Sequence, residues 1–337
     1  MKQVFLLASS LLINQFSFSQ GVGNDGSLRG GVKSQRIDVV PPLRAHHALV
    51  YDEEEKRVLL TGGSTPIEGG QRFIIYNDVW AFDGKRWEQL GNAGDKRSGI
   101  GIAYNGRAKE LVSFGGYSND GALADLRIYE NNDWKIKANK PEMIATEPGF
   151  VYDSDRDRYV AFGGSAGRGK VNADTWEWDG KEWMKKDIPG PPGRQAFAMV
   201  YDAKRKRTIL FGGMGETPEK SYNDTWEYDG AKWERVDTGG PGNRLAMGYT
   251  YDSKRGLVLI FGGMGPNGIL GDTWGWDGKS WTQLSATGPS PRLMGYMAYD
   301  KARDKTVLFG GRIKWPQDAN DTWEWDGERW SEVNFEN

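Results

Sequence analysis

Five arginines recur at equivalent places along this chain, and each lies seven residues before a tyrosine: Arg44, Arg97, Arg194, Arg244 and Arg292. Guanidinium groups bind carboxylates through paired hydrogen bonds. If the repeated segments close into a ring, the five side chains are expected to approach a common axis and form an electropositive funnel for an acidic ligand. The alternative, which the regular recurrence favours, is that each arginine ties neighbouring segments together through backbone carbonyls or an acidic side chain.

Glu147 is the candidate catalytic residue. It lies two residues after Ala145, which takes the place of the arginine in the third segment. A carboxylate beside an arginine cluster can act as a general acid or base, or accept a hydrogen bond from a hydroxyl group. A solvated carboxylate at the rim is the alternative, and exposed carboxylates far outnumber catalytic ones.

Aromatic residues follow several of the glycine pairs that end an apolar run. They are Trp315, Phe73, Tyr117 and Tyr222, and they occupy corresponding loops. Together they are candidates for a stacking platform that binds a sugar ring or an apolar side chain of a partner. The alternative is that each aromatic residue anchors a loop on its own segment.

Other kinds of chemistry have little support in this sequence. The two histidines, His46 and His47, are adjacent on an expected strand and should point to opposite faces, and the chain has no cysteine, so a metal site is not expected. The glycine pairs end strands instead of surrounding a phosphate. We therefore expect no cofactor.

The segment from Arg194 to Val236 shows which elements position these residues. It contains four short runs rich in β-branched and aromatic residues, each closed by Gly, Asp or Asn, which predicts four strands. Asp229-Gly230 predicts a two-residue type I′ hairpin that places Trp226 opposite Trp233. The same spacing predicts the pairs Trp80 with Trp87, Trp176 with Trp183, Trp274 with Trp281, and Trp323 with Trp330.

The segment is repeated along the chain. Glycine pairs at 62/63, 115/116, 163/164, 212/213, 262/263 and 310/311 recur about every 50 residues. An apolar run ending in Gly-Gly, a variable loop, Asp-x-Trp and a second Trp seven residues later resemble the kelch motif. The resemblance implies an all-β, six-bladed propeller of four-stranded antiparallel blades, covering about 44–90, 97–138, 145–187, 194–237, 244–286 and 292–335. The second repeat departs most, with Leu126 expected in place of the first Trp and Glu130-Asn131 in place of Asp-Gly.

Strand direction divides the expected propeller into two faces. The loops after the six glycine pairs and the five arginines share one end, which we call the long-loop face. The opposite end holds the Tyr-Asp turns and the Asp-Gly turns, and we call it the Tyr–Asp face. Loops held on a rigid scaffold commonly carry recognition, so the long-loop face is the expected binding surface.

The N-terminus predicts an exported protein. Met1-Lys2, an apolar run to Ile13 and small residues before Gln20 are typical of a signal peptide over 1–19, followed by a flexible lead over 20–34 and the propeller over 35–337. The apolar run is too short to cross a membrane, and we expect a periplasmic or secreted location. The ring closes with either Arg36–Val40 or Trp330–Phe335. The net charge is −2, from 44 basic and 46 acidic residues that are well mixed, so no nucleic-acid surface is expected.

Two hypotheses of function follow, from different classes. The resemblance implies an interaction module that binds a protein or glycan. The alternative is a cofactor-free sugar-acid mutarotase similar to the periplasmic kelch epimerases of N-acetylneuraminate, with Glu147, Arg97 and Arg194 as candidates. The absence of cysteine excludes a galactose oxidase type of copper site. A spacer role in an envelope assembly remains a third hypothesis.

Overall fold

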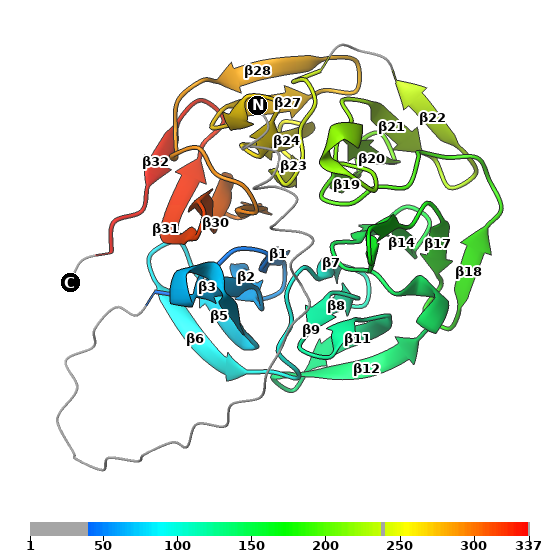
Figure 1. Cartoon of the computed structure of the whole chain (residues 1–337), viewed down its shortest axis with the longest axis horizontal. Helices are drawn as coiled ribbons and strands as arrows, with labels where there is room; N and C mark the ends of the chain where they lie inside the picture. The colour runs from blue at the N-terminus through cyan, green and yellow to red at the C-terminus, as the bar shows by residue number, and fades with distance from the viewer. Residues whose placement is uncertain (1–39, 237–239, 336–337) are drawn as a thin grey trace.

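The computed structural model describes residues 40–236 and 240–335, so the predicted signal peptide (1–19) and lead (20–34) lie outside the described residues. Six antiparallel sheets of four strands form a ring around a central axis (Figure 1). The first strand of each sheet contacts the first strands of both neighbours, from β1 (Ala48–Asp52) around to β29 (Tyr296–Asp300) and back. The chain is therefore the six-bladed all-β propeller expected from its repeats.

Each blade takes four strands in chain order, from the axis to the rim. Blade 1 contains β1, β2 (Arg57–Thr61), β5 (Asp78–Phe82) and β6 (Trp87–Asn92). Blade 2 contains β7 (Gly101–Asn105), β8 (Glu110–Phe114), β11 (Asp125–Glu130) and β12 (Asp133–Asn139). Blade 3 contains β13 (Gly149–Asp153), β14 (Arg158–Phe162), β17 (Thr175–Trp178) and β18 (Trp183–Lys186).

The C-terminal half repeats this order. Blade 4 contains β19 (Ala198–Asp202), β20 (Arg207–Phe211), β21 (Thr225–Tyr228) and β22 (Trp233–Val236). Blade 5 contains β23 (Gly248–Asp252), β24 (Leu257–Phe261), β27 (Thr273–Trp276) and β28 (Trp281–Ser285). Blade 6 contains β29, β30 (Lys305–Lys314), β31 (Gln317–Trp325) and β32 (Trp330–Glu332).

The loops after the glycine pairs carry small structures of their own. Four two-stranded hairpins are formed by β3 (Ser64–Ile67) with β4 (Arg72–Ile75), β9 (Tyr117–Ser118) with β10 (Gly121–Ala122), β15 (Ser165–Gly167) with β16 (Lys170–Val171), and β25 (Met264–Gly265) with β26 (Gly268–Ile269). The described residues also contain three 3-10 helices between strands: η1 (Glu68–Gly70), η2 (Pro141–Met143) and η3 (Pro218–Lys220). No helix in the described residues is long and apolar enough to cross a membrane.

The hydrophobic core lies between neighbouring blades. Trp233 of blade 4 packs on Phe162 of blade 3 with ring centroids 5.5 Å apart. Its Nε1–H donates a hydrogen bond to the Thr175 hydroxyl of blade 3 at 2.9 Å. The same bond joins Trp281 to Thr225, Trp330 to Thr273, and Trp87 to Thr322. The last of these joins blade 1 to blade 6. β32 is the outer strand of blade 6, and residues 36–39 of the alternative closing segment lie outside the described residues.

The turn between the third and fourth strands differs from the predicted two-residue hairpin. In blade 4 it has four residues, Asp229 to Lys232, and Gly230 alone among them has a positive φ, of 95°. The Asp229 carboxylate accepts hydrogen bonds from the N–H groups of Ala231 and Lys232 at 2.8 and 2.9 Å. Aspartate at the start of a turn commonly binds the following amides in this way, so the Asp-Gly dipeptide does not form a type I′ turn here.

The longer turn shifts the register by two residues. Tyr228 lies opposite Trp233, whereas Trp226 lies opposite Arg235. The predicted Trp226–Trp233 pair and its equivalents were therefore wrong. The observed pairs are Phe82 with Trp87, Trp178 with Trp183, Trp276 with Trp281, and Trp325 with Trp330.

Blade 2 departs from the repeat, but the residue that replaces the first Trp lies one position later than predicted. The register of β11 puts Leu126 where blade 4 has Thr225. Arg127, and not Leu126, therefore takes the place of the first Trp. Because leucine has no hydroxyl, Nε1 of Trp183 in blade 3 is buried without a hydrogen-bond partner.

A second set of arginines, which the sequence analysis did not identify, joins blades on the Tyr–Asp face. Arg156 donates hydrogen bonds to Asp153 and Glu177 at 2.7 and 2.6 Å. Its guanidinium lies over Gly230 of the next blade, only 2.4 Å from where a Cβ would stand. Arg205, Arg255 and Arg303 cover the turn glycines of blades 5, 6 and 1 in the same way. This contact is a second reason for glycine in these turns.

Candidate functional site

The five recurring arginines are buried clamps inside their own blades. Arg194 donates from Nη1 to the carbonyl of Gly212 at 2.9 Å and to Asp224 Oδ1 at 2.6 Å, and from Nη2 to Asp224 Oδ2 at 3.0 Å. Trp226 donates to the same carboxylate at 2.8 Å. The equivalent ion pairs are Arg44 with Asp78, Arg97 with Asp125, Arg244 with Asp272, and Arg292 with Asp321.

This burial rules out the predicted funnel. The five arginines are between 0 and 6% exposed, and each guanidinium is already occupied by an aspartate. The main chain of the same residues links blades: the N–H of Gly213 in blade 4 donates to the carbonyl of Arg244 in blade 5 at 2.8 Å. Each arginine therefore links two blades: its side chain is held in its own blade, and its backbone bonds to the preceding blade.

The aspartates of these clamps have displaced pKa values. Burial alone would raise the pKa of the Asp224 carboxyl, but the hydrogen bonds and charge of Arg194 outweigh it and hold the pKa below its usual value. The pKa values of Asp125, Asp272 and Asp321 are lowered against burial for the same reason. The carboxylates are therefore ionised partners of the arginines over the whole physiological range.

The four loop aromatic residues do not form one platform. Phe73 and Trp315 come together across the junction of blades 1 and 6, with ring centroids 6.0 Å apart. Tyr117 is buried, and its main chain pairs with Ser98. Tyr222 lies instead against the Arg194 guanidinium, which is centred 4.1 Å from its ring. Only the Phe73–Trp315 pair is therefore a candidate contact surface.

Contacts with Arg312 and with blade 1 hold Trp315 in place. The Arg312 guanidinium lies 5.0 Å from the Trp315 ring centroid, and Arg312 Nε donates to buried Asp318 at 2.7 Å. On the blade 1 side the ring abuts Gly70, where a Cβ would stand 2.4 Å from it. Trp315 and Phe73 are both partly exposed. They form a rigid aromatic surface, which we call the aromatic seam.

Glu147 lies at the central axis beside a histidine. The residue two positions after each recurring arginine, or after Ala145 in blade 3, has a φ between 53° and 62° in all six blades: His46, Gly99, Glu147, Ala196, Ala246 and Met294. His46 Nδ1 lies 2.5 Å from Glu147 Oε1. Gly99 lies between them, accepting the Glu147 N–H and donating its own N–H to the His46 carbonyl, each at 2.8 Å. Glycine leaves the two side chains free to meet.

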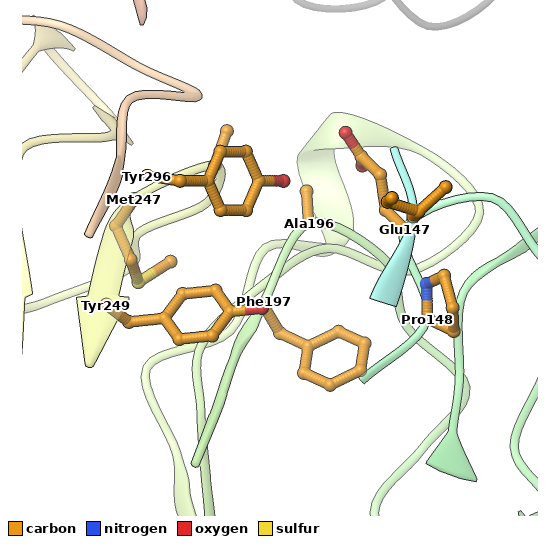
Figure 2. Close-up of a pocket in the computed structure, with 9 residues that line it drawn as sticks. Glu147, Pro148, Ala196, Phe197, Met247, Tyr249 and Tyr296 are labelled. Carbon is orange, nitrogen blue, oxygen red and sulfur yellow. The ribbon is translucent and has the colours of Figure 1, made fainter. Parts of the chain in front are cut away.

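A small chamber lies beside this pair. Its wall contains Glu147, Phe197, Met247, Tyr249 and Tyr296, and its volume is about 20 Å³. Figure 2 shows the Tyr296 hydroxyl and the Glu147 carboxylate pointing toward the same space. Burial raises the pKa of Tyr249 and of Tyr296, and the charge of Glu147 raises both further. The two hydroxyls therefore stay neutral.

His46, Tyr249 and Tyr296 are site residues that were not predicted from the sequence. His46 and His47 were expected to alternate on a strand, but β1 begins at Ala48 and His46 has a φ of 55°. His47 is buried against Tyr296 and Phe309, and burial, with the charges of Arg44 and His46, lowers its pKa. In the described part of the chain, no cluster of three metal-ligating side chains is found.

Comparison with known proteins supports the repeat architecture. No curated protein matches this chain. A family model described as the KLHDC2/KLHL20/DRC7 Kelch-repeats domain matches residues 151–337, which is more than half of the 337 residues. The match extends from within β13 of blade 3 through blades 4, 5 and 6, and the whole ring has six four-stranded blades. The chain therefore belongs to this family of Kelch-repeat domains.

Proposed function

We propose that this protein is an exported interaction module that binds a protein or a glycan through its long-loop face. Kelch propellers are commonly interaction modules. The proposal rests on the aromatic seam, where Trp315 and Phe73 meet on a rigid base. Ile74, next to Phe73, is 41% exposed, and Leu43 of the same blade is 47% exposed. Exposed apolar and aromatic side chains held rigidly are typical of binding surfaces.

The test is a screen of the full chain against peptide and glycan arrays, repeated with Trp315→Ala. Loss of a central aromatic contact commonly costs at least 2 kcal/mol of binding free energy, so we expect the affinity for the best ligand to fall about thirtyfold. Ile74→Ser should also weaken binding. The matched control is Ile136→Ser, because Ile136 is 63% exposed on the outer strand β12. Unchanged binding by Trp315→Ala, or no ligand on either array, would contradict the proposal.

The sugar-acid mutarotase is a second candidate, and the Glu147–His46 contact favours it, because this pair can accept and return a proton. Two observations weigh against it. Arg97 and Arg194, its proposed partners, are held by Asp125 and Asp224, and the chamber beside Glu147 is the size of one water. NMR of anomer exchange in added sialic acid tests it: acceleration by the wild type, abolished in Glu147→Gln, would establish this activity.

A further inference from the structure

The carboxylate of Glu147 has one oxygen free for a ligand. The side chain is only 6% exposed, and His46 contacts Oε1. Oε2 is buried and has no hydrogen-bond partner in the protein. A buried carboxylate oxygen without a partner is costly, so it is a strong site for a donor. Among the described residues that line the chamber, Glu147 is the only charged side chain.

A wider channel along the axis adjoins the chamber. A cavity of about 200 Å³ is lined by the first strands of the six blades, and it shares Ile100, Tyr249 and Tyr296 with the chamber wall. Its wall continues to Tyr104, Tyr152, Tyr201 and Tyr251, at the Tyr–Asp ends of these strands. The wall presents both polar and apolar surface, and Phe150, Met199 and Met297 are among its apolar residues. The channel therefore extends from the Tyr–Asp ends of these strands to the tyrosines that it shares with the chamber beside Glu147.

We propose that this channel binds a small primary amine, whose ammonium group donates a hydrogen bond to Glu147 Oε2 and whose apolar body lies along the channel. The site lies on the axis, away from the aromatic seam, so it is independent of the function proposed above. The chamber volume of about 20 Å³ holds one water-sized group. An ammonium group has that size, whereas a quaternary trimethylammonium group is too large.

The charge of the site selects an amine over an alcohol of the same length. A hydrogen bond between ionised groups is about twice as strong as one between neutral groups. The aromatic rings of Tyr249 and Tyr296 line the same chamber and attract a cation electrostatically. His46 holds Oε1, so the carboxylate is oriented before the ligand arrives. Each of these features favours a primary ammonium group.

Calorimetry with n-hexylamine tests the proposal. We expect the full chain to bind n-hexylamine at least tenfold more tightly than n-hexanol or hexyltrimethylammonium. Glu147→Gln keeps the side-chain shape and removes the charge, and it should weaken hexylamine binding by tenfold or more. The matched control is Glu142→Gln, an exposed residue of the 3-10 helix η2, which should bind like the wild type. Equal affinity in Glu147→Gln and the wild type, with both folded by circular dichroism, would overturn the proposal, as would equal affinity for the amine and the alcohol.

Methyl NMR locates the ligand without a mutation. In protein labelled at the methionine methyl groups, hexylamine should shift the signals of Met247 in the chamber and of Met199 and Met297 in the channel. The signal of Met184, which is 36% exposed on the outer strand of blade 3, should stay in place. Shifts at Met184 with none at Met247 would place the amine elsewhere and overturn the proposal.

Discussion

His46 of blade 1 and Glu147 of blade 3 meet at the central axis, with Nδ1 and Oε1 2.5 Å apart, although a whole blade separates them along the chain. The blade between them presents Gly99, which has no side chain to block the contact. The two residues occupy equivalent positions in their repeats. A ring of repeats can therefore bring together a histidine and a glutamate at equivalent positions, where the other blades have small or apolar residues.

Gly99→Ala tests this arrangement. The backbone should accept alanine, because Ala196 and Ala246 have φ of 54° and 56° at the equivalent positions. The new Cβ would lie 3.1 Å from Cγ of Glu147 and should push the carboxylate away from His46. We expect the imidazole NMR signals of His46 to shift. Gly242→Ala, where a Cβ meets no atom within 4 Å, is the control for a positive-φ glycine. Identical His46 signals in both variants would contradict the arrangement.

Arg194→Ala should destabilise the fold strongly. It leaves the buried Asp224 carboxylate without its cation, and breaking one partner of a buried ion pair commonly costs about 3–5 kcal/mol. Urea unfolding at neutral pH measures the loss. The control is Arg329→Ala, because the Arg329 side chain is 85% exposed and its loss should change the free energy of unfolding by less than about 0.5 kcal/mol. A change within about 1 kcal/mol of wild type for Arg194→Ala would contradict the clamp.

The same clamps predict acid sensitivity. The pKa values of Asp125, Asp224, Asp272 and Asp321 are lower in the folded state than the unfolded value of about 3.9, because the hydrogen bonds and charges of their arginines outweigh the effect of burial. Groups of this kind contribute full stability above the unfolded pKa and lose it as the pH falls through the folded pKa.

The free energy of unfolding should therefore decrease once the pH drops below about 4. Urea unfolding at a series of pH values from 7 to 2.5 measures the decrease. Asp224→Asn removes one of the titrating groups, so its stability should fall less steeply over this acid range, although it is less stable at pH 7. An acid slope as steep as that of the wild type would show that Asp224 does not contribute.

Thr225→Val should cost about 1–3 kcal/mol, because it leaves the Trp281 N–H buried without its acceptor. Blade 2 already has this deficit, since Leu126 occupies the equivalent place and Nε1 of Trp183 has no partner. Thermal unfolding measures the effect, and Thr282→Val on the exposed side of β28 is the control. Equal melting temperatures for the two variants would show that this interblade hydrogen bond adds no stability.

The sequence was sufficient to predict the fold and the period of its repeats. Glycine pairs recur in every blade, and Asp-x-Trp recurs in every blade except blade 2, because these residues make fixed contacts: in blade 4, Asp224 binds both Arg194 and Trp226. The register of the outer strands was not predictable from the Asp-Gly dipeptide. The Asp229 carboxylate binds two amides of the turn and lengthens it, and that contact depends on side-chain geometry.

The candidate sites were harder to predict. Recurrence indicated a structural role for the arginines, but it did not show whether a guanidinium faces solvent or Asp224. Glu147 was found as a break in the repeat, whereas its contact with His46 depends on how the ring brings separate blades to the axis. Both residues stand out when the residues two places after the recurring arginines, and after Ala145 in blade 3, are compared, since the other blades have Gly, Ala or Met there.

The most direct test of the proposed recognition surface is hydrogen–deuterium exchange, with and without the strongest ligand from the arrays. The account predicts slower exchange on binding in residues 64–77 of blade 1 and 312–319 of blade 6, which carry Phe73 and Trp315 of the aromatic seam. Exchange at the Tyr-Asp turns on the opposite face should not change. Slower exchange confined to those turns, with none around Trp315, would contradict the account.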